Sequence, residues 1–261
     1  SSPALIAFGR LVAVSEEGER IIVDTGVLRF AVKKKGFNLV DEAWIRVTDA
    51  GGKAAEQRIV KPEGLSGPVL WSNHPNRPAH RKYTSAADAE CKVTIEEKGP
   101  MRVVIRAAGR HLPAEPEGPD DKLLDYVIRI HAYRGKPYVR VVYAAECRQG
   151  KSVNTFTSLN RWHVAVPGDL GEDLRYQFGT SGAPVIGTFG KPGGKPAHDR
   201  AWLLCDDSET YTVGGAPTFH RTMGVLDGRT MAIKPLNVGY VDLCGAERGI
   251  MVSVRNFWQN H

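Results

Sequence analysis

The stretch LDYVIRIHAY-RGKP-YVRVVYAAE, residues 124–146, decides the fold class of this chain. Apolar and polar residues alternate on both sides of the RGKP segment, and a period of two is typical of half-buried β-strands. Gly135 and Pro137 are turn residues. The stretch therefore predicts an antiparallel hairpin closed at Gly135, whose strands bury one shared face: Tyr126, Ile128, Ile130, Val139, Val141 and Tyr143.

Short apolar runs separated by turn residues recur along the rest of the chain. They predict further strands at residues 20–24, 28–32, 43–47, 91–97, 101–108, 155–158, 162–166, 174–178, 201–205, 211–213, 219–223, 230–233, 239–243 and 250–257. Residues 50–89 are predicted as long loops with one weak strand, and 111–121 and 179–198 as loops. No window of about 12 residues has a helical period. The predicted fold is all-β, a large antiparallel β-sandwich with very little helix.

The composition limits the kinds of partner. The formal charge of +6 and the pI near 9.1 fit either a soluble surface or an anionic partner. We expect no nucleic acid, because the chain has no long Lys/Arg run and no zinc-finger spacing. We expect no membrane partner, because no apolar stretch approaches about 18 residues. An acidic polysaccharide fits better, since arginines and aromatic residues are interleaved along the predicted strands.

The sequence indicates no cofactor and no metal. The four cysteines, Cys91, Cys147, Cys205 and Cys244, form no CxxC pair, and buried free thiols are the favoured interpretation. The carboxylate pairs Asp120-Asp121 and Asp206-Asp207 are adjacent residues that face opposite sides of a strand, so they are poor evidence for calcium.

The densest cluster of functional side chains lies between Trp71 and Tyr83. Sugars are commonly held by an aromatic face and planar hydrogen-bonding groups, and arginine grips a carboxylate through two hydrogen bonds. We therefore select Trp71, Asn73, Arg77 and Arg81 as candidate substrate-binding residues. His74, His80 and Tyr83 are candidate catalytic residues, because a tuned imidazole or phenol can move a proton. The alternative is an ordinary basic surface loop.

A second candidate is one face of the strands around residues 102–140. If these strands are neighbours, alternation gathers Arg102, Arg106, Arg129, His131, Tyr133, Tyr138 and Arg140 on that face. A cationic and aromatic face suits an anionic polymer, and an ordinary solvated face is the alternative. Arg161 and His163 form a third, smaller candidate, where a structural histidine is the alternative.

Four segments carry a resemblance to a known family: IVDTGVLRF at 22–30, EKGPMRVV at 97–104, YVIRI with YRGKPYVR at 126–140, and GIMVSVRNFWQ at 249–259. In this order they resemble the exo-rhamnogalacturonan lyases of polysaccharide lyase family 26 and the related YetA-like proteins. Each segment alone is common in proteins, and the order of the four gives the resemblance its weight.

The resemblance implies an N-terminal β-barrel, a central sandwich of the galactose-mutarotase-like supersandwich type, and a C-terminal α/α toroid. We expect residues 1–20 to be the tail of a preceding domain or a linker, and 21–261 to be the central sandwich. We expect the barrel and the toroid to lie outside this sequence, so the toroid is a candidate partner. The substrate class implies a secreted or periplasmic protein.

The implied activity is β-elimination on a pectic backbone of rhamnose and uronate. This chemistry needs a cation to neutralise the uronate carboxylate, a base for the C5 proton and an acid for the leaving oxygen. Arginine suits the first role without a metal, although other lyases use calcium. Two alternatives stay open: a non-catalytic carbohydrate-binding or scaffolding sandwich, and a mutarotase-like sugar enzyme.

Overall fold

The computed structural model describes residues 11–48, 52–62, 66–72, 81–115, 122–146, 159–180, 184–189, 201–206, 221–226, 229–232 and 237–254. Their regular structure is β-strand throughout, apart from one 3₁₀ turn at Ser85–Ala87. The prediction of an all-β chain is confirmed. The chain divides into two compact units, residues 1–169 and 170–261, which are described separately.

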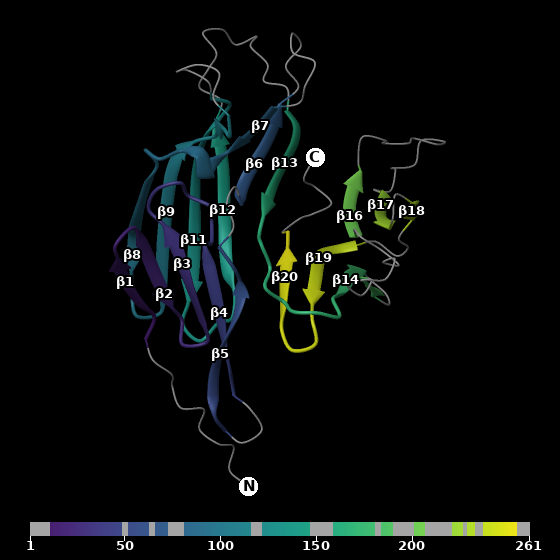
Figure 1. The fold of residues 1–261 in the computed structure, drawn as a ribbon, viewed down its shortest axis with the longest axis horizontal. Helices are drawn as coiled ribbons and strands as arrows, with labels where there is room; N and C mark the ends of the chain where they lie inside the picture. Colours follow the sequence, from purple (N-terminus) through teal and green to yellow (C-terminus); the bar gives the residue numbers. More distant parts are fainter. Residues whose placement is uncertain are drawn as a thin grey trace, which may run out of the picture. The chain divides into compact units, whose positions relative to one another are not determined.

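Three antiparallel sheets make up the first unit (Figure 1). The N-terminal sheet has the order β1-β2-β3-β4-β5, with bounds Ala13–Glu17, Arg20–Asp24, Leu28–Lys33, Glu42–Thr48 and Ala54–Val60. The central sheet has the order β12-β11-β9-β8, with bounds Val139–Glu146, Asp125–Tyr133, Arg102–Arg110 and Lys92–Lys98. The short sheet has the order β10-β7-β6-β13, with bounds Leu112–Pro113, Arg81–Thr84, Gly67–Ser72 and Leu159–Ala165.

The core of this unit lies between the N-terminal and central sheets. Phe37 stacks on Tyr126 with ring centroids 6.0 Å apart, and both rings are buried. Alternate residues of β2, β3, β9 and β11 complete the core: Ile21, Val23, Leu28, Phe30, Val32, Val103, Ile105, Ala107, Ile128, Ile130 and Ala132. This face-to-face packing is that of a β-sandwich and confirms the predicted architecture.

The predicted hairpin of residues 124–146 is confirmed as β11 and β12, with Ile130 opposite Val141 and Ile128 opposite Tyr143. Gly135 closes the turn with φ of 64°, which favours glycine. The predicted burial of the three β12 residues is wrong, since Val141 is 37% exposed, and Val139 and Tyr143 are partly exposed. These side chains do share the face of the β11 core residues, but among the described residues β12 pairs only with β11. An edge strand is less well covered.

Three predicted loops contain strands. Residues 50–89 hold β5, β6 and β7 instead of one weak strand. The sequence hid β5 because its residues are mostly exposed and of low β-propensity, and it hid β6 because Pro68 lies within the strand. Residues 111–121 were predicted as a solvated loop, yet His111 is fully buried and β10 follows it. Residues 179–198 contain β15, Val185–Thr188.

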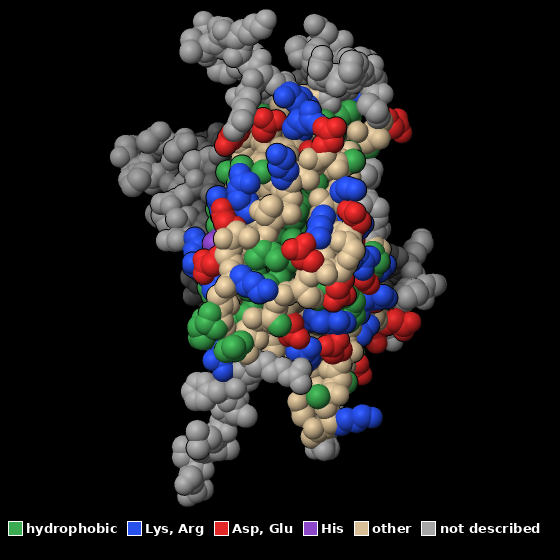
Figure 2. All heavy atoms as spheres, turned by 90° about the vertical axis from the view of Figure 1, so that its left-hand side faces the viewer, with side chains coloured by type: hydrophobic (Ala, Val, Ile, Leu, Met, Phe, Trp, Pro, Cys, Tyr) green, Lys and Arg blue, Asp and Glu red, His purple; other side chains and the backbone are tan. Residues whose placement is uncertain are grey.

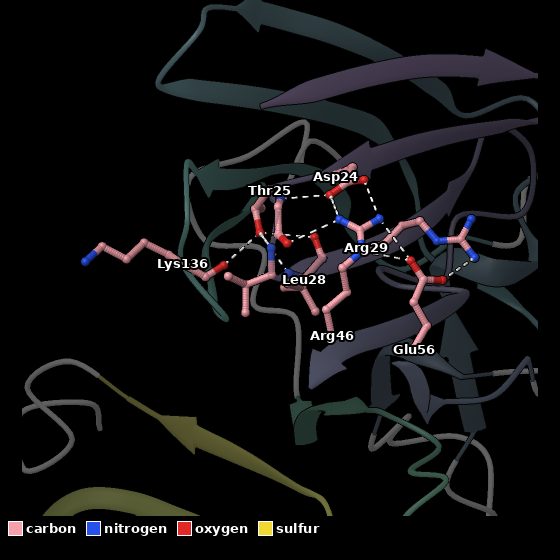
Figure 3. A network of polar contacts seen from close by, with 9 residues as sticks. Asp24, Thr25, Leu28, Arg29, Arg46, Glu56 and Lys136 are labelled. Carbon is pink, nitrogen blue, oxygen red and sulfur yellow. Dashed lines mark hydrogen bonds and ion pairs between the residues drawn. The ribbon is translucent and has the colours of Figure 1, made fainter. Parts of the chain in front are cut away.

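A polar network at the start of β3 joins the two large sheets (Figure 3). Both carboxylate oxygens of Asp24 accept from Arg46, each at 2.7 Å, and Arg46 also pairs with Glu56 at 2.9 Å. Burial raises the pKa of Asp24, but the hydrogen bonds from Arg46 and Gly26 outweigh it and lower the pKa. The hydroxyl of Thr25 reaches across to the carbonyl oxygen of Lys136 at 2.9 Å.

The second unit contains two antiparallel sheets. One has the order β15-β14-β19-β20, with β14 at Arg175–Thr180, β19 at Asn237–Cys244 and β20 at Gly249–Ser253. The other contains β16 at Ala201–Asp206, β17 at Arg221–Leu226 and β18 at Arg229–Ala232. The strands predicted at 155–158 and 211–213 lie outside the described residues.

The structure also bears on the expectations for the N-terminal residues, the cysteines and membrane-spanning helices. β1 pairs with β2, from Ala13 opposite Asp24 to Glu17 opposite Arg20, while the predicted boundary near residue 20 stays a prediction. Cys91 is a buried free thiol and Cys244 a partly buried one. Cys147 and the side chain of Cys205 lie outside the described residues. Within the described part of the chain, no helix has the length and apolar character to cross a membrane.

Candidate functional site

The outer face of the central sheet gathers the predicted cationic and aromatic residues. Register places Arg102 opposite Tyr133, and Arg106 opposite Arg129. It also places His131 opposite Arg140 on β12. Residues opposite each other on one face of an antiparallel pair have Cβ atoms about 5 Å apart. The predicted neighbourhood of strands is therefore present, and we call this set the arginine face: Arg102, Arg106, Arg129, His131, Tyr133, Tyr138 and Arg140.

Two glutamates of β8 form ion pairs with two arginines of this face. Glu96 accepts from Arg129 through Nε at 2.6 Å and Nη2 at 2.9 Å. Glu97 accepts from Arg102 at 3.0 Å and 2.5 Å. The hydrogen bonds from these arginines are the main reason that the pKa values of both glutamates are lowered. Arg129 and Arg102 are thus held by carboxylates within the sheet.

A β-bulge explains why the sequence did not reveal these two contacts. Consecutive residues of a regular strand face opposite sides, so only one of Glu96 and Glu97 would reach the outer face. The register between β8 and β9 shifts between Ile95 and Glu97, which leaves Glu96 as the extra residue. Such a bulge re-aims side chains, and here both carboxylates reach arginines of the same face.

On the β12 side of the arginine face, less of the positive charge is balanced by carboxylates. Among the described residues, Arg140 is exposed and has no ion pair. Burial, followed by the charges of Arg102 and Arg140, lowers the pKa of His131. Tyr133 and Tyr138 have ring centroids 6.2 Å apart, and Tyr138 is 53% exposed. By contrast, Figure 2 shows positive and negative side chains interspersed over the view from the β1 and β8 edges.

The Trp71–Tyr83 candidates do not form one cluster in the described part of the chain. Trp71 is the second-last residue of β6 and Tyr83 lies in β7, so this segment is not wholly a loop. Tyr83 pairs in register with Leu70 and is buried against Leu70, Leu123 and Leu124, so Trp71 faces the other side of the sheet. Arg81 lies over the Tyr83 ring at 5.7 Å and donates to the carbonyl oxygen of Glu115 at 2.6 Å.

The other candidates fall into two groups. Asn73, His74, Arg77 and His80 lie outside the described residues, and so does the side chain of Arg161. His163 is partly buried in β13, where it pairs in register with Val69. In the same ladder Arg161 pairs with Trp71, so these two positions are adjacent across the strands. The catalytic and binding roles of all these residues stay predictions.

A contact between the buried His111 and the partly buried Tyr143 was not found from the sequence. His111 follows β9 and is fully buried, and its Nδ1 lies 2.8 Å from the carbonyl oxygen of Leu124. A carbonyl can only accept, so Nδ1 carries the proton and Nε2 accepts from the hydroxyl of Tyr143. The two residues are 32 positions apart, and no local motif marks their contact.

The environment of this pair keeps both groups neutral. Burial lowers the pKa of His111 and raises the pKa of Tyr143. The ring of Trp162 packs edge-on against Tyr143 with centroids 4.9 Å apart and is itself 48% exposed. A neutral imidazole beside a protonated phenol, both satisfied, favours a structural role at the β12 edge.

Comparison with known families assigns the sandwich. The family model described as the PcRGLX-like protein central beta sandwich domain matches residues 12–155, which is more than half of the chain. The chain belongs to the PcRGLX-like central β-sandwich family. This rhamnogalacturonan lyase-related family confirms the resemblance found from the sequence motifs. A comparison with curated protein sequences finds no match.

Three of the resemblance motifs meet at one end of this PcRGLX-like sandwich. The amide of Gly135 donates to the carbonyl oxygen of Thr25 at 2.7 Å, and the amide of Arg134 donates to that of Met101 at 2.9 Å. The IVDTGVLRF, EKGPMRVV and YRGKPYVR segments therefore hold their turns together. The Thr25–Gly135 bond joins the two large sheets of the PcRGLX-like sandwich, and the Arg134–Met101 bond links two turns of the central sheet.

The described part of the PcRGLX-like sandwich shows no group of three or more His, Cys, Asp or Glu side chains that could hold a metal ion. The expectation that no cofactor is needed stays a prediction, as does the open question of calcium.

Proposed function

We propose that this chain is the substrate-binding sandwich of a polysaccharide lyase that cleaves a rhamnose- and uronate-containing pectic backbone by β-elimination. Membership of the PcRGLX-like family supports the substrate class. The observation that carries the proposal is the arginine face, where guanidinium groups lie beside exposed tyrosine on one sheet surface. Guanidinium groups bind carboxylates, and aromatic rings bind the apolar faces of sugars.

The described residues account for binding better than for proton transfer. Arg140 can neutralise a uronate carboxylate, which makes the C5 proton more acidic. The neutral pair of the buried His111 and the partly buried Tyr143 faces the other side of β12 and is unsuited to reach the same substrate. In this proposal the base and the acid come from the segment that holds His74 and His80.

A second candidate is a non-catalytic carbohydrate-binding sandwich. One observation favours it, because Glu96 and Glu97 already neutralise Arg129 and Arg102. A face whose charge is mostly balanced binds a polymer through few contacts, as suits a module that positions substrate for another domain. The two candidates share the binding surface and differ only in whether a bond is cleaved.

Two measurements on the full chain test the proposal. Calorimetry with rhamnogalacturonan should show binding at low salt that weakens at high salt, since the screening length shortens to about 8 Å at physiological ionic strength. Incubation with the polymer should produce near-ultraviolet absorbance, because β-elimination creates a 4,5-unsaturated uronate. Binding without absorbance would support the non-catalytic module. No binding at low salt by a folded sample would contradict both candidates.

A further inference from the structure

We infer that Arg140, His131 and Tyr138 form a subsite for a single uronate residue, with the sugar carboxylate on Arg140. The inference rests on the proposed function, because it selects one place on the arginine face. It differs from a general cationic surface in assigning the anion to one guanidinium and the sugar ring to one phenol. The ligand class is a hexuronate with a free carboxylate.

Competition within the sheet singles out Arg140. Glu96 occupies the guanidinium of Arg129 with two hydrogen bonds, and Glu97 occupies that of Arg102 in the same way. Arg106 lies 3.9 Å from Glu96. To bind any of these arginines, a substrate carboxylate would have to displace a glutamate carboxylate of the protein itself. Arg140 is exposed and has no such counter-ion among the described residues.

His131 places an imidazole directly beside Arg140. The two residues are register partners, and the Nδ1 atom of His131 is buried without a hydrogen-bond partner among the described residues. The charged groups that act on this imidazole are Arg102 of β9, Glu97 of β8, Arg129 of its own strand and Arg140 of β12. Three of the four are cations, so a bound anion would favour the protonated imidazole.

The tyrosines place an aromatic surface at the correct distance from Arg140. Tyr138 and Arg140 are two residues apart, which in an extended segment is about 7 Å. This distance suits a pyranose ring on the phenol with its carboxylate at the guanidinium. Tyr138 is 53% exposed, and the ring of Tyr133, 6.2 Å away, supports it from the sheet.

The test uses the full chain and galacturonate oligomers, with methyl-esterified oligomers as the uncharged probe. Arg140→Lys keeps the charge but loses the planar fork, so affinity should fall about tenfold. The matched control is the double variant Arg110→Gln with Glu90→Gln, which removes an arginine of β9 outside the arginine face together with its ion-pair partner, without changing net charge. It should bind within about twofold of the unsubstituted chain, and Tyr138→Ala should weaken binding several-fold.

The imidazole gives an independent readout. Adding galacturonate should raise the pKa of His131 followed by NMR, and methyl-esterified oligomers should leave it unchanged. Equal losses in Arg140→Lys and in the double variant would overturn the subsite and leave the proposed function intact, because the polymer would still bind the face. Equal affinity for esterified and free oligomers would also overturn the subsite. A folded chain that binds no rhamnogalacturonan at low salt would instead refute the proposed function.

Discussion

The backbone of Thr25 accepts a hydrogen bond from the amide of Gly135 at 2.7 Å, so the tip of the β2–β3 hairpin is bonded to the tip of the β11–β12 hairpin. The side chain of Thr25 strengthens this junction. Its hydroxyl accepts from the amide of Leu28 at 2.9 Å and lies 2.9 Å from the carbonyl oxygen of Lys136, to which it donates. Thr25 is completely buried, so none of these groups can turn to water instead.

Replacing Thr25 by Val should therefore lower the free energy of unfolding by about 1–3 kcal/mol, because the amide of Leu28 loses its buried partner. Thr25→Ser keeps the hydroxyl and should recover most of the loss. Urea unfolding of both variants measures the difference. Equal destabilisation by Val and Ser would show that the hydroxyl is unimportant.

Replacing Ile128 by Ala should cost about 2–5 kcal/mol, because the side chain is fully buried between the two large sheets. Val142→Ala is the matched control, since Val142 lies on the outer face of the neighbouring strand and is 39% exposed. It should cost less than about 0.5 kcal/mol. Chemical denaturation measures both, and a small effect at Ile128 would contradict the sandwich core.

Stability should fall as the pH drops below 6.5, the ordinary pKa of histidine, because burial lowers the pKa of His111 in the folded state. The unfolded chain then binds a proton that the folded chain excludes. The stabilisation is complete above 6.5 and is lost as the pH falls towards the folded value. Unfolding free energies measured from about pH 7.5 to 5.5 should show this slope.

His111→Asn should flatten that slope more than His131→Asn does, since His131 is only partly buried. A larger effect at His131 would show that the buried imidazole is not the main titrating group.

Replacing His74 or His80 by Ala should reduce turnover of rhamnogalacturonan more than binding, if either supplies the base or acid of the proposed elimination. A loss in kcat of about 10²–10⁴ is the usual contribution of such a group. Initial rates of near-ultraviolet absorbance measure turnover, and calorimetry measures binding. Lys92→Ala, at an exposed position of β8, is the control, and an equal loss there would argue against a special role for His74 and His80.

The sequence predicted the strands whose environment produces alternation. β2 and β11 each bury alternate residues against the opposite sheet, so neighbours such as Ile128 and Arg129 differ in polarity. β5 has no comparable signal, because Ala54, Ala55 and Glu56 are all exposed. The short element β10 is invisible for another reason, since its two residues join the sheet only through pairing with Tyr83 and Thr84.

The arginine face was predictable because it needs only a period of two on adjacent strands. Its electrostatic state was not, because the bulge at Glu96 changes which way a side chain points, and a bulge leaves no reliable mark in a single sequence. The His111–Tyr143 contact was equally hidden, since it depends on the packing of segments 32 residues apart. Contacts of this kind are set by tertiary structure.

The bulge in β8 has a further consequence, for association between chains. An edge strand exposes unpaired amides and carbonyls, which another chain can extend by adding a strand. At β8 the bulge and the charged residues Lys92, Glu96, Glu97 and Lys98 hinder such addition. The opposite edge, β12, has a regular ladder with β11 and exposes Val141 and Val142. A segment that extends the central sheet would therefore join it at β12, beside Arg140.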